Sequence, residues 1–430
     1  MKAKNTGVII LLSLLAVSCR LDPIFFIIAS ETAPKKPRIE GAPTNMVVFE
    51  RDYPDPTLED PDNIKTVPIL YVASGRLHWY AKATDTNKPR WDSGEYSIDQ
   101  PGGKIIALAA TREYLYALCL TGSGISSTLR RIGRSDIKWE PVASPTGSYS
   151  LIQSIHADRE NSYLFAGARS SRDASLYALL YLDNNVKPPV LHALREGTSI
   201  LSGAVCQGDN YYLSTRGDGI FQIPKDNLAR NEIDPRQLDE SVDEETSMRN
   251  NRMFMGMIKL ENGDIIAVER NGGALYRIRS DRPDSFERMY YTAPSNTGGI
   301  STGKYAIGAL ALWEAYNDDA KKLLVTSIQG GLYSTSISSY THGYVEFILK
   351  LDGSFNTEET RRDPGRLQSL TDGNQDRYTA SIGKHPINHL FQAPKEIDEN
   401  MTFFASTQTN GLWSYRDRPD NGGWQWNAED

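Results

Sequence analysis

The sequence predicts an all-β fold, a seven-bladed β-propeller of four-stranded antiparallel blades. Three observations support this prediction. A hairpin of two β-rich strands, joined by a turn that usually contains glycine, recurs seven times along the chain. Small apolar strands precede several of these hairpins, and aromatic or charged strands follow several of them. No long segment shows the helical period of about 3.6 residues.

The second strand of each hairpin begins with leucine or isoleucine. These positions are Leu77, Leu129, Leu176, Ile220, Leu275, Leu332 and Leu412. Their spacing is 44 to 57 residues, except for 80 residues before the last. Units of roughly 40–50 residues with four strands each are typical of propellers. A single blade cannot bury both of its faces, so we expect the seven units to stack and close into a ring.

The outer elements of each unit follow from their composition. Predicted first strands are small and apolar, which suits a narrow central axis, and they include Ile105–Ala109, Leu201–Val205 and Ile307–Leu310. Predicted fourth strands include Lys138–Glu140, Tyr344–Phe347 and Trp424–Trp426. The segment Met46–Glu50 is either the first strand of blade one or a closing strand on blade seven. Three long insertions, at residues 225–251, 352–376 and 385–400, interrupt the period.

The amino-terminal segment has the pattern of an export signal. Lysines at positions 2 and 4 precede an apolar run, Gly7–Val17, which is shorter than the roughly 20 residues that span a bilayer. The run ends at Leu15–Cys19, which resembles the lipobox of bacterial lipoproteins. This resemblance implies cleavage after residue 18 and lipidation of Cys19. The alternatives are an ordinary signal peptide, with Cys19 incidental, and an uncleaved anchor extended by Ile24–Ile28.

A tether separates the lipidated cysteine from the propeller. Residues 19–45 contain Pro34, Pro37 and Pro43 among polar residues and show no apolar period. Proline-rich segments of this kind are extended and semi-rigid. The predicted organisation is therefore a signal peptide at residues 1–18, a tether at 19–45 and the propeller at 46–430.

Charge and cysteine content limit the function classes. The chain has a net charge of −7, and removal of the two lysines in the signal makes it −9. Nucleic-acid binding, which favours a basic face, is not expected. Cys119 and Cys206 lie in apolar, strand-like contexts and are interpreted as buried thiols, with a disulfide between them as the alternative.

No catalytic motif is visible in the sequence, and we expect neither a metal nor a cofactor. His385 and His389 are four residues apart, but Pro386 argues against a regular strand between them. A metal site would need a third ligand, so these histidines are interpreted as solvent-facing or hydrogen-bonded. The acidic pair Glu244–Glu245 is interpreted as solvated surface.

One set of turn residues stands out. The turn inside the hairpin carries a long hydrogen-bond donor in five successive units: Arg169, Arg216, Arg270, Gln329 and Gln408. In a propeller these turns share one face, around the mouth of the central channel. The five residues are therefore predicted to form a ring that binds a partner or an anionic ligand. The alternative is ordinary polar turn residues.

The lipobox, the tether and the seven hairpins together resemble β-propeller lipoproteins of diderm bacteria, particularly those of spirochaetes. The resemblance implies a protein of the bacterial cell envelope that is held to a lipid bilayer by N-terminal acyl chains. The expected function is a non-enzymatic scaffold for an envelope protein partner. The alternatives are a small-ligand or carbohydrate binder at the channel mouth and a propeller hydrolase or lyase.

Overall fold

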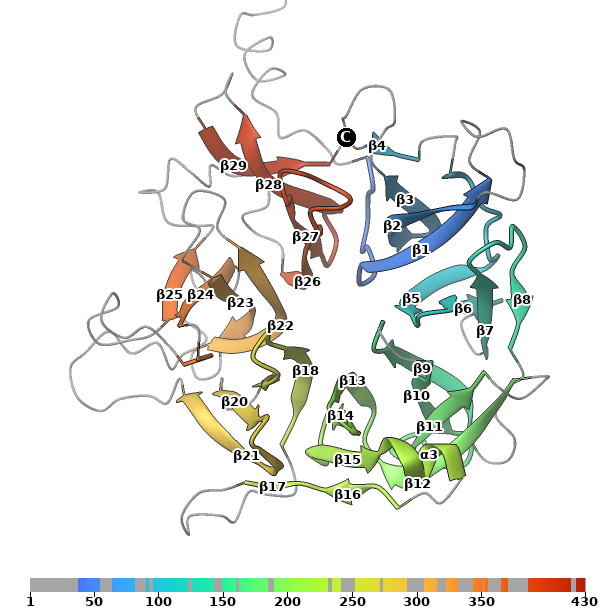
Figure 1. Ribbon diagram of the computed structural model, residues 1–430, viewed down its shortest axis with the longest axis vertical. Helices are drawn as coiled ribbons and strands as arrows, with labels where there is room; N and C mark the ends of the chain where they lie inside the picture. Colours follow the sequence, from blue (N-terminus) through green and yellow to red (C-terminus); the bar gives the residue numbers. More distant parts are fainter. Residues whose placement is uncertain are drawn as a thin grey trace, which may run out of the picture. The chain divides into compact units, whose positions relative to one another are not determined.

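Strands make up nearly all of the regular structure in the computed structural model, and they form seven sheets arranged in a ring (Figure 1). The structure describes residues 38–54, 64–81, 90–92, 96–122, 126–142, 149–159, 162–184, 189–230, 234–240, 252–270, 274–291, 305–314, 322–331, 343–350, 352–354, 365–369, 386–418 and 423–429. Cys19, the signal segment and most of the predicted tether lie outside these residues. Within the described ranges no helix is long and apolar enough to cross a membrane.

Each blade is an antiparallel sheet whose first strand lies nearest the axis of the ring (Figure 1). Blade 1 contains β1 (Val47–Pro54), β2 (Ile64–Ser74), β3 (Arg76–Ala81) and β4 (Arg90–Trp91). Blade 2 contains β5 (Lys104–Ala110), β6 (Tyr114–Thr121), β7 (Ser126–Gly133) and β8 (Glu140–Pro141). Blade 3 contains β9 (Tyr149–Ala157), β10 (Leu164–Ser170), β11 (Tyr177–Asp183) and β12 (Val190–Thr198).

The remaining blades repeat this order. Blade 4 contains β13 (Leu201–Gln207), β14 (Asn210–Thr215), β15 (Ile220–Pro224) and β16 (Arg236–Gln237), with the short helix α3 (Lys225–Arg230) before β16. Blade 5 contains β18 (Phe254–Lys259), β19 (Ile265–Glu269), β20 (Ala274–Arg279) and β21 (Arg282–Tyr291), and β17 (Asp239–Glu240) pairs in parallel with β21. Blade 6 contains β22 (Tyr305–Glu314), β23 (Lys322–Gly331), β24 (Gly343–Leu349) and β25 (Gly365–Ser369). Blade 7 contains β26 (Ile387–Gln392), β27 (Phe403–Thr407), β28 (Leu412–Arg418) and β29 (Gly423–Ala428).

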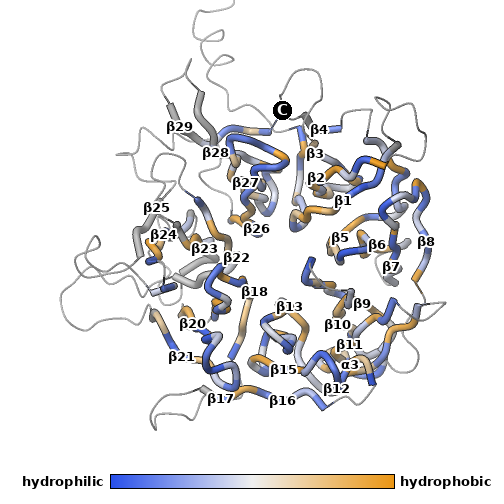
Figure 2. The backbone as a smooth tube through the Cα atoms, in the orientation of Figure 1, coloured by the Kyte–Doolittle hydropathy of each residue, from blue (hydrophilic) through white to orange (hydrophobic). Residues whose placement is uncertain are grey.

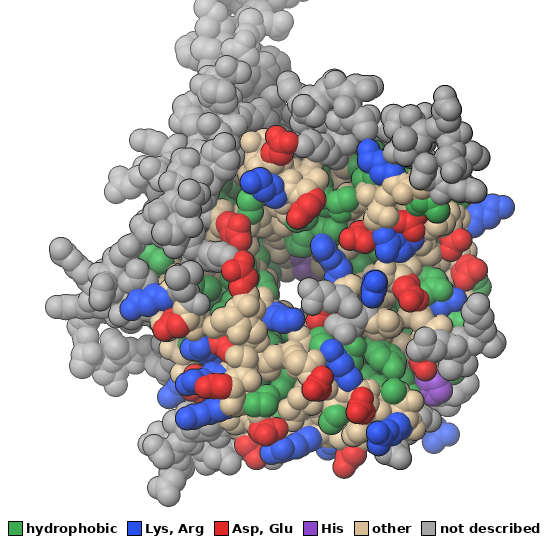
Figure 3. All heavy atoms as spheres, in the orientation of Figure 1, with side chains coloured by type: hydrophobic (Ala, Val, Ile, Leu, Met, Phe, Trp, Pro, Cys, Tyr) green, Lys and Arg blue, Asp and Glu red, His purple; other side chains and the backbone are tan. Residues whose placement is uncertain are grey.

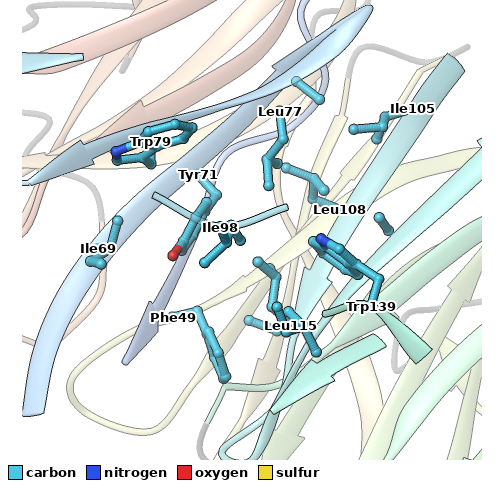
Figure 4. Close-up of a cluster of buried hydrophobic side chains, with 14 of the residues drawn as sticks. Phe49, Ile69, Tyr71, Leu77, Trp79, Ile98, Ile105, Leu108, Leu115 and Trp139 are labelled. Carbon is cyan, nitrogen blue, oxygen red and sulfur yellow. The ribbon is translucent and has the colours of Figure 1, made fainter. Parts of the chain in front are cut away.

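Hydrophobic stretches lie within the strands (Figure 2), and the buried core is divided among the blade interfaces. One apolar cluster fills each of the seven junctions between neighbouring blades. Figure 4 shows the junction of blades 1 and 2, where Phe49 and Tyr71 face Leu108 and Leu115. Burial of both faces of a blade therefore depends on its two neighbours, which is why the blades form a ring.

The ring closes without a shared blade. The strand β1 pairs with β2, with Val47 opposite Tyr71, so Met46–Glu50 contributes to the first strand of blade one rather than to a closing strand on blade seven. Closure instead uses the segment Arg38–Asn45, which the sequence assigned to the tether and which we call the clasp.

The clasp bonds to blade 7 at its start and to blades 1 and 2 at its end. The backbone N–H of Leu412 donates to the Ile39 carbonyl at 3.0 Å, and the Arg38 N–H donates to the Glu429 carbonyl at 2.6 Å. The Thr44 N–H donates to the Ala73 carbonyl at 2.8 Å. The side-chain amide of Asn45 donates to the carbonyl of Leu108, in blade 2, at 2.6 Å.

Two kinds of assignment from the sequence are wrong in detail, namely the strand order in blade 6 and the insertions. In blade 6 the third strand is β24, which the sequence placed fourth, and Leu332 lies outside the described residues. Each predicted insertion contains a strand of the ring, respectively β16, β25 and β26. The physical reason is position. A third strand is covered on both faces and suits the apolar run of β24, whereas a fourth strand is an edge and tolerates the polar residues of β16 and β25.

Candidate functional site

The inner strands of all seven blades surround a central cavity of about 770 Å³. The lining residues include Asn45–Val48, Ile106–Ala110, Gln153–Ala157, Ser202–Ala204, Met255–Met257, Ala309–Leu310 and Asn388–Phe391. Small residues permit close packing around the axis: a Cβ atom on Gly203 would lie 3.2 Å from the backbone nitrogen of Met257 in the next blade. Basic side chains and a histidine border the central opening in Figure 3.

Bulges in the inner strands direct extra residues toward the cavity. In five blades the pairing of the first and second strands skips a residue of the first strand, and in blade 3 it also skips a second one, Ser150. One skipped residue from each of these blades lines the cavity: Ile106, Gln153, Ser202, Met255 and Asn388. A bulge of this kind reorients side chains and is common beside functional sites.

Local hydrogen bonds hold Arg216 at the cavity. The residue begins the turn between β14 and β15, where Gly219 has a φ of +76° that favours glycine. The Thr215 N–H donates to the Gly219 carbonyl at 2.9 Å, and the Asp218 N–H donates to Thr215 Oγ1 at 3.0 Å. The N–H of Arg216 itself donates to the Ile200 carbonyl at 3.0 Å. The backbone of this arginine is therefore fixed beside the inner strand.

Arg270 occupies the equivalent position in the neighbouring blade. Its N–H donates to the Met253 carbonyl at 2.9 Å, and Met253 also forms a β-bridge with Arg216. Within the described part of the chain, neither arginine forms an ion pair with a carboxylate. Arg277, by contrast, is bonded through Nε to Asp264 Oδ2 at 2.6 Å. Arg216 and Arg270 thus place two exposed positive charges at the cavity, and no described carboxylate pairs with either of them.

Two histidines complete the cluster. His156 comes from β9, and His389 follows the bulge in β26. Burial and the charge of Arg216 lower the pKa of each imidazole to about 4. Both histidines are therefore neutral at pH 7, and each can donate one hydrogen bond and accept another. Burial, followed by the charge of Arg270, also lowers the pKa of Arg216.

The described cavity lining is positively charged, whereas the chain as a whole is negatively charged. The chain has a net charge of −7. Yet the described residues that line the cavity include three arginines, at positions 159, 216 and 270, and no aspartate or glutamate. Guanidinium groups bind carboxylate, sulfonate and phosphate groups through paired hydrogen bonds. The chemistry of this site therefore favours an anion.

The structure brings together only two members of the predicted donor ring. Arg216 and Arg270 line the cavity, whereas Arg169 lies in β10 opposite Tyr177 and does not line it. Gln408 is exposed in a turn, where its N–H donates to the Pro386 carbonyl at 2.9 Å. Gln329 lies in β23, and its side chain is outside the described part of the structure.

Sequence reasoning did not place either histidine in the site. His156 belongs to an inner strand that was not assigned, and His389 was considered only together with His385, which lies outside the described residues. The available signal was position, because an inner strand precedes every hairpin and lines the axis. Among the described residues no group of three or more histidine, cysteine, aspartate or glutamate side chains could hold a metal ion. Cys119 and Cys206 are buried free thiols.

Comparison with known proteins finds similar solved structures but no matching family. No protein-family model matches the chain, and no curated protein matches its sequence. The periplasmic gluconolactonase PpgL of Pseudomonas aeruginosa is similar in structure, with a TM-score of 0.48 and 11% identity over 90% of this chain and 97% of that one. The WD40 propeller domain of Doa1 has a TM-score of 0.46 and 10% identity, over 90% and 96%. A YCF48 structure with a bound D1 peptide has a TM-score of 0.45 and 10% identity, over 89% and 94%.

Proposed function

We propose that this protein is a lipid-anchored, non-enzymatic binding protein of the bacterial cell envelope that holds a small anionic ligand in its central channel. The main supporting observation is the pair of unpaired arginines, Arg216 and Arg270, in a cavity whose described lining has no carboxylate. The cavity volume of about 770 Å³ is within the range of roughly 300–1,000 Å³ that is common for small-ligand sites.

This cavity is the reason for placing ligand binding ahead of the protein scaffold expected from the sequence. A scaffold would use its outer rims and would not need two arginines at the lining of its channel that no described carboxylate pairs with. A glycosidase-type hydrolase would need a pair of catalytic carboxylates, and the described lining offers none. Binding of an anion without chemistry is therefore the simplest use of these side chains.

The membrane anchor in this proposal rests on the first 19 residues. The cationic start, the short apolar run and Cys19 support lipidation and export. Stable anchoring requires two or more acyl chains. The test is detergent partition of Cys19→Ala beside the wild type: the variant should move to the aqueous phase. Retention of the variant in the detergent phase would point to an uncleaved anchor instead.

The ligand proposal is tested with a probe of fixed charge. Naphthalene disulfonate is anionic across the whole working pH range, and naphthalene diol is its neutral counterpart. We expect calorimetric binding of the disulfonate alone. Arg216→Gln and Arg270→Gln should each weaken it about tenfold or more, because a charged hydrogen bond contributes roughly 1.5–3 kcal/mol.

Arg169→Gln is the matched control. This arginine lies near the end of β10 in blade 3 and does not line the cavity, so its loss should leave the affinity unchanged. Equal weakening by all three substitutions would indicate a general charge effect. Equal binding of the diol and the disulfonate would show that the cavity does not select anions.

A further inference from the structure

Two histidines line the same cavity as the two arginines. His156 hydrogen-bonds to the backbone of Leu201, and both imidazoles are partly buried. Burial and the charge of Arg216 lower the pKa of both imidazoles, which keeps them neutral at pH 7. His389 lowers the pKa of His156 further. Both histidines line the same cavity as Arg216 and Arg270, and the charge of Arg216 acts on each of them.

Apart from the two histidines, every ionisable side chain in the described lining is positively charged. Arg159, Arg216 and Arg270 are cationic, and the remaining titratable lining residues are the two histidines. Tyr177 acts on Arg216 from outside the lining. No described lining residue therefore supplies the negative charge that would favour a protonated imidazole, whereas a bound anion would supply it.

A negative charge placed among these groups reverses the balance. An opposite charge within about 4–6 Å stabilises the protonated form of a base. The anion would offset the Arg216 charge and accept a hydrogen bond from an imidazolium, which donates from both ring nitrogens. We infer that the channel takes up a proton together with its anionic ligand, and that His156 and His389 are the proton acceptors.

This inference rests on the proposed anion site and adds a direction to its pH dependence. Without the anion the histidines become protonated near pH 4, and with the anion they do so at higher pH. Between those two values the affinity rises as the pH falls, by at most about tenfold per pH unit for each proton taken up. Below pH 4, and at pH values well above the pKa of the histidines in the complex, the affinity is independent of pH.

The experiment measures protons and affinity together. Naphthalene disulfonate does not titrate, so every proton taken up binds to the protein. Calorimetric titrations at pH 7.5, 6.5 and 5.5, each in two cationic buffers of different ionisation enthalpy, give the proton count directly. We expect the protein to take up protons when the ligand binds, up to two per ligand. We also expect tighter binding at the lower pH. This measurement needs no variant.

Variants then assign the protons. His156→Gln with His389→Gln should bind the disulfonate with an affinity that no longer depends on pH, and each single variant should retain part of the dependence. His192→Gln is the control, since His192 stacks on Tyr181 at 5.2 Å in the outer strand of blade 3. Its pH dependence should match the wild type.

The outcomes separate the two proposals. Binding without proton uptake and with constant affinity would overturn the proton coupling and leave the anion site standing. Absence of binding at every pH would overturn both. Loss of the pH dependence in His192→Gln, or its persistence in the double variant, would overturn the assignment to the cavity histidines.

Discussion

At the scale of single residues, the two partly buried cavity histidines make the fold sensitive to acid. An unfolded chain protonates histidine near pH 6.5, whereas His156 and His389 protonate near pH 4 in the fold. Between these values the unfolded chain binds more protons than the folded chain. The free energy of unfolding therefore falls as the pH drops from about 6.5 to about 4, and these two groups have no effect on it above that window.

We predict that replacing both histidines with glutamine removes this acid sensitivity. Urea unfolding at pH 7, 5.5 and 4.5 measures it. The wild type should lose at most about 3 kcal/mol per histidine over the window, and less where water in the channel screens the charge. The double variant should lose only the part due to other groups. An equally steep fall in both proteins would mean that the imidazoles are already charged in the fold.

At the scale of secondary-structure elements, close packing of the inner strands around the axis limits the size of the side chains that they can carry. A Cβ atom on Gly203 would lie 2.9 Å from Ser214 Oγ and 3.2 Å from the Met257 nitrogen. A Cβ atom on Gly256, in the next inner strand, would meet nothing within 4 Å. These two glycines therefore form a matched pair with opposite expectations.

We predict that Gly203→Ala destabilises the protein by about 1–3 kcal/mol through overpacking. Gly256→Ala should be neutral or stabilising by about 0.4–1 kcal/mol, because alanine reduces the freedom of the unfolded chain. Thermal and urea unfolding of both variants provide the comparison. A similar loss of stability in both would indicate that backbone freedom, rather than contact with the next blade, is limiting.

The same elements show what a sequence can reveal. Hairpins such as β14–β15 are visible, because two apolar strands flank a glycine turn. The strand β26 is not, because it faces water in the channel and lacks an apolar pattern. Its bulge at Asn388 also shifts the side-chain alternation by one residue. The orientation of His389 into the site therefore depends on an irregularity that periodicity does not encode.

At the scale of the whole molecule, blade number was predictable and closure was not. The seven repeats are encoded locally, whereas the clasp makes contacts across almost the full length of the chain. Ile39 is buried, at 1% exposure, in the cluster that joins blades 7 and 1. Trp91 Nε1 donates to Glu429 Oε2 at 2.7 Å across the same junction. Residues 38–45 have the composition of a tether, so the sequence does not reveal that they close the ring.

We predict that removal of residues 1–44 lowers the stability far more than removal of residues 1–36. The longer deletion removes the clasp and exposes the apolar surface of blades 1 and 7, while the shorter one leaves the compact unit intact. Ile39→Ala is a milder change and should cost about 2–4 kcal/mol. Thermal unfolding gives the order of the three. Equal melting temperatures for the two deletions would show that the clasp does not contribute to closure.

The contact of the clasp and blade 1 with blade 7 also determines which surface an incomplete copy of the protein exposes. During synthesis the clasp and blade 1 emerge first, and their partners Leu412 and Glu429 emerge last. A nascent chain therefore carries an uncovered apolar sheet face until blade 7 has been made. A stop codon within blade 7 would leave six blades finished and the first one still exposed. Such a product offers a ready surface for association with other unfinished chains.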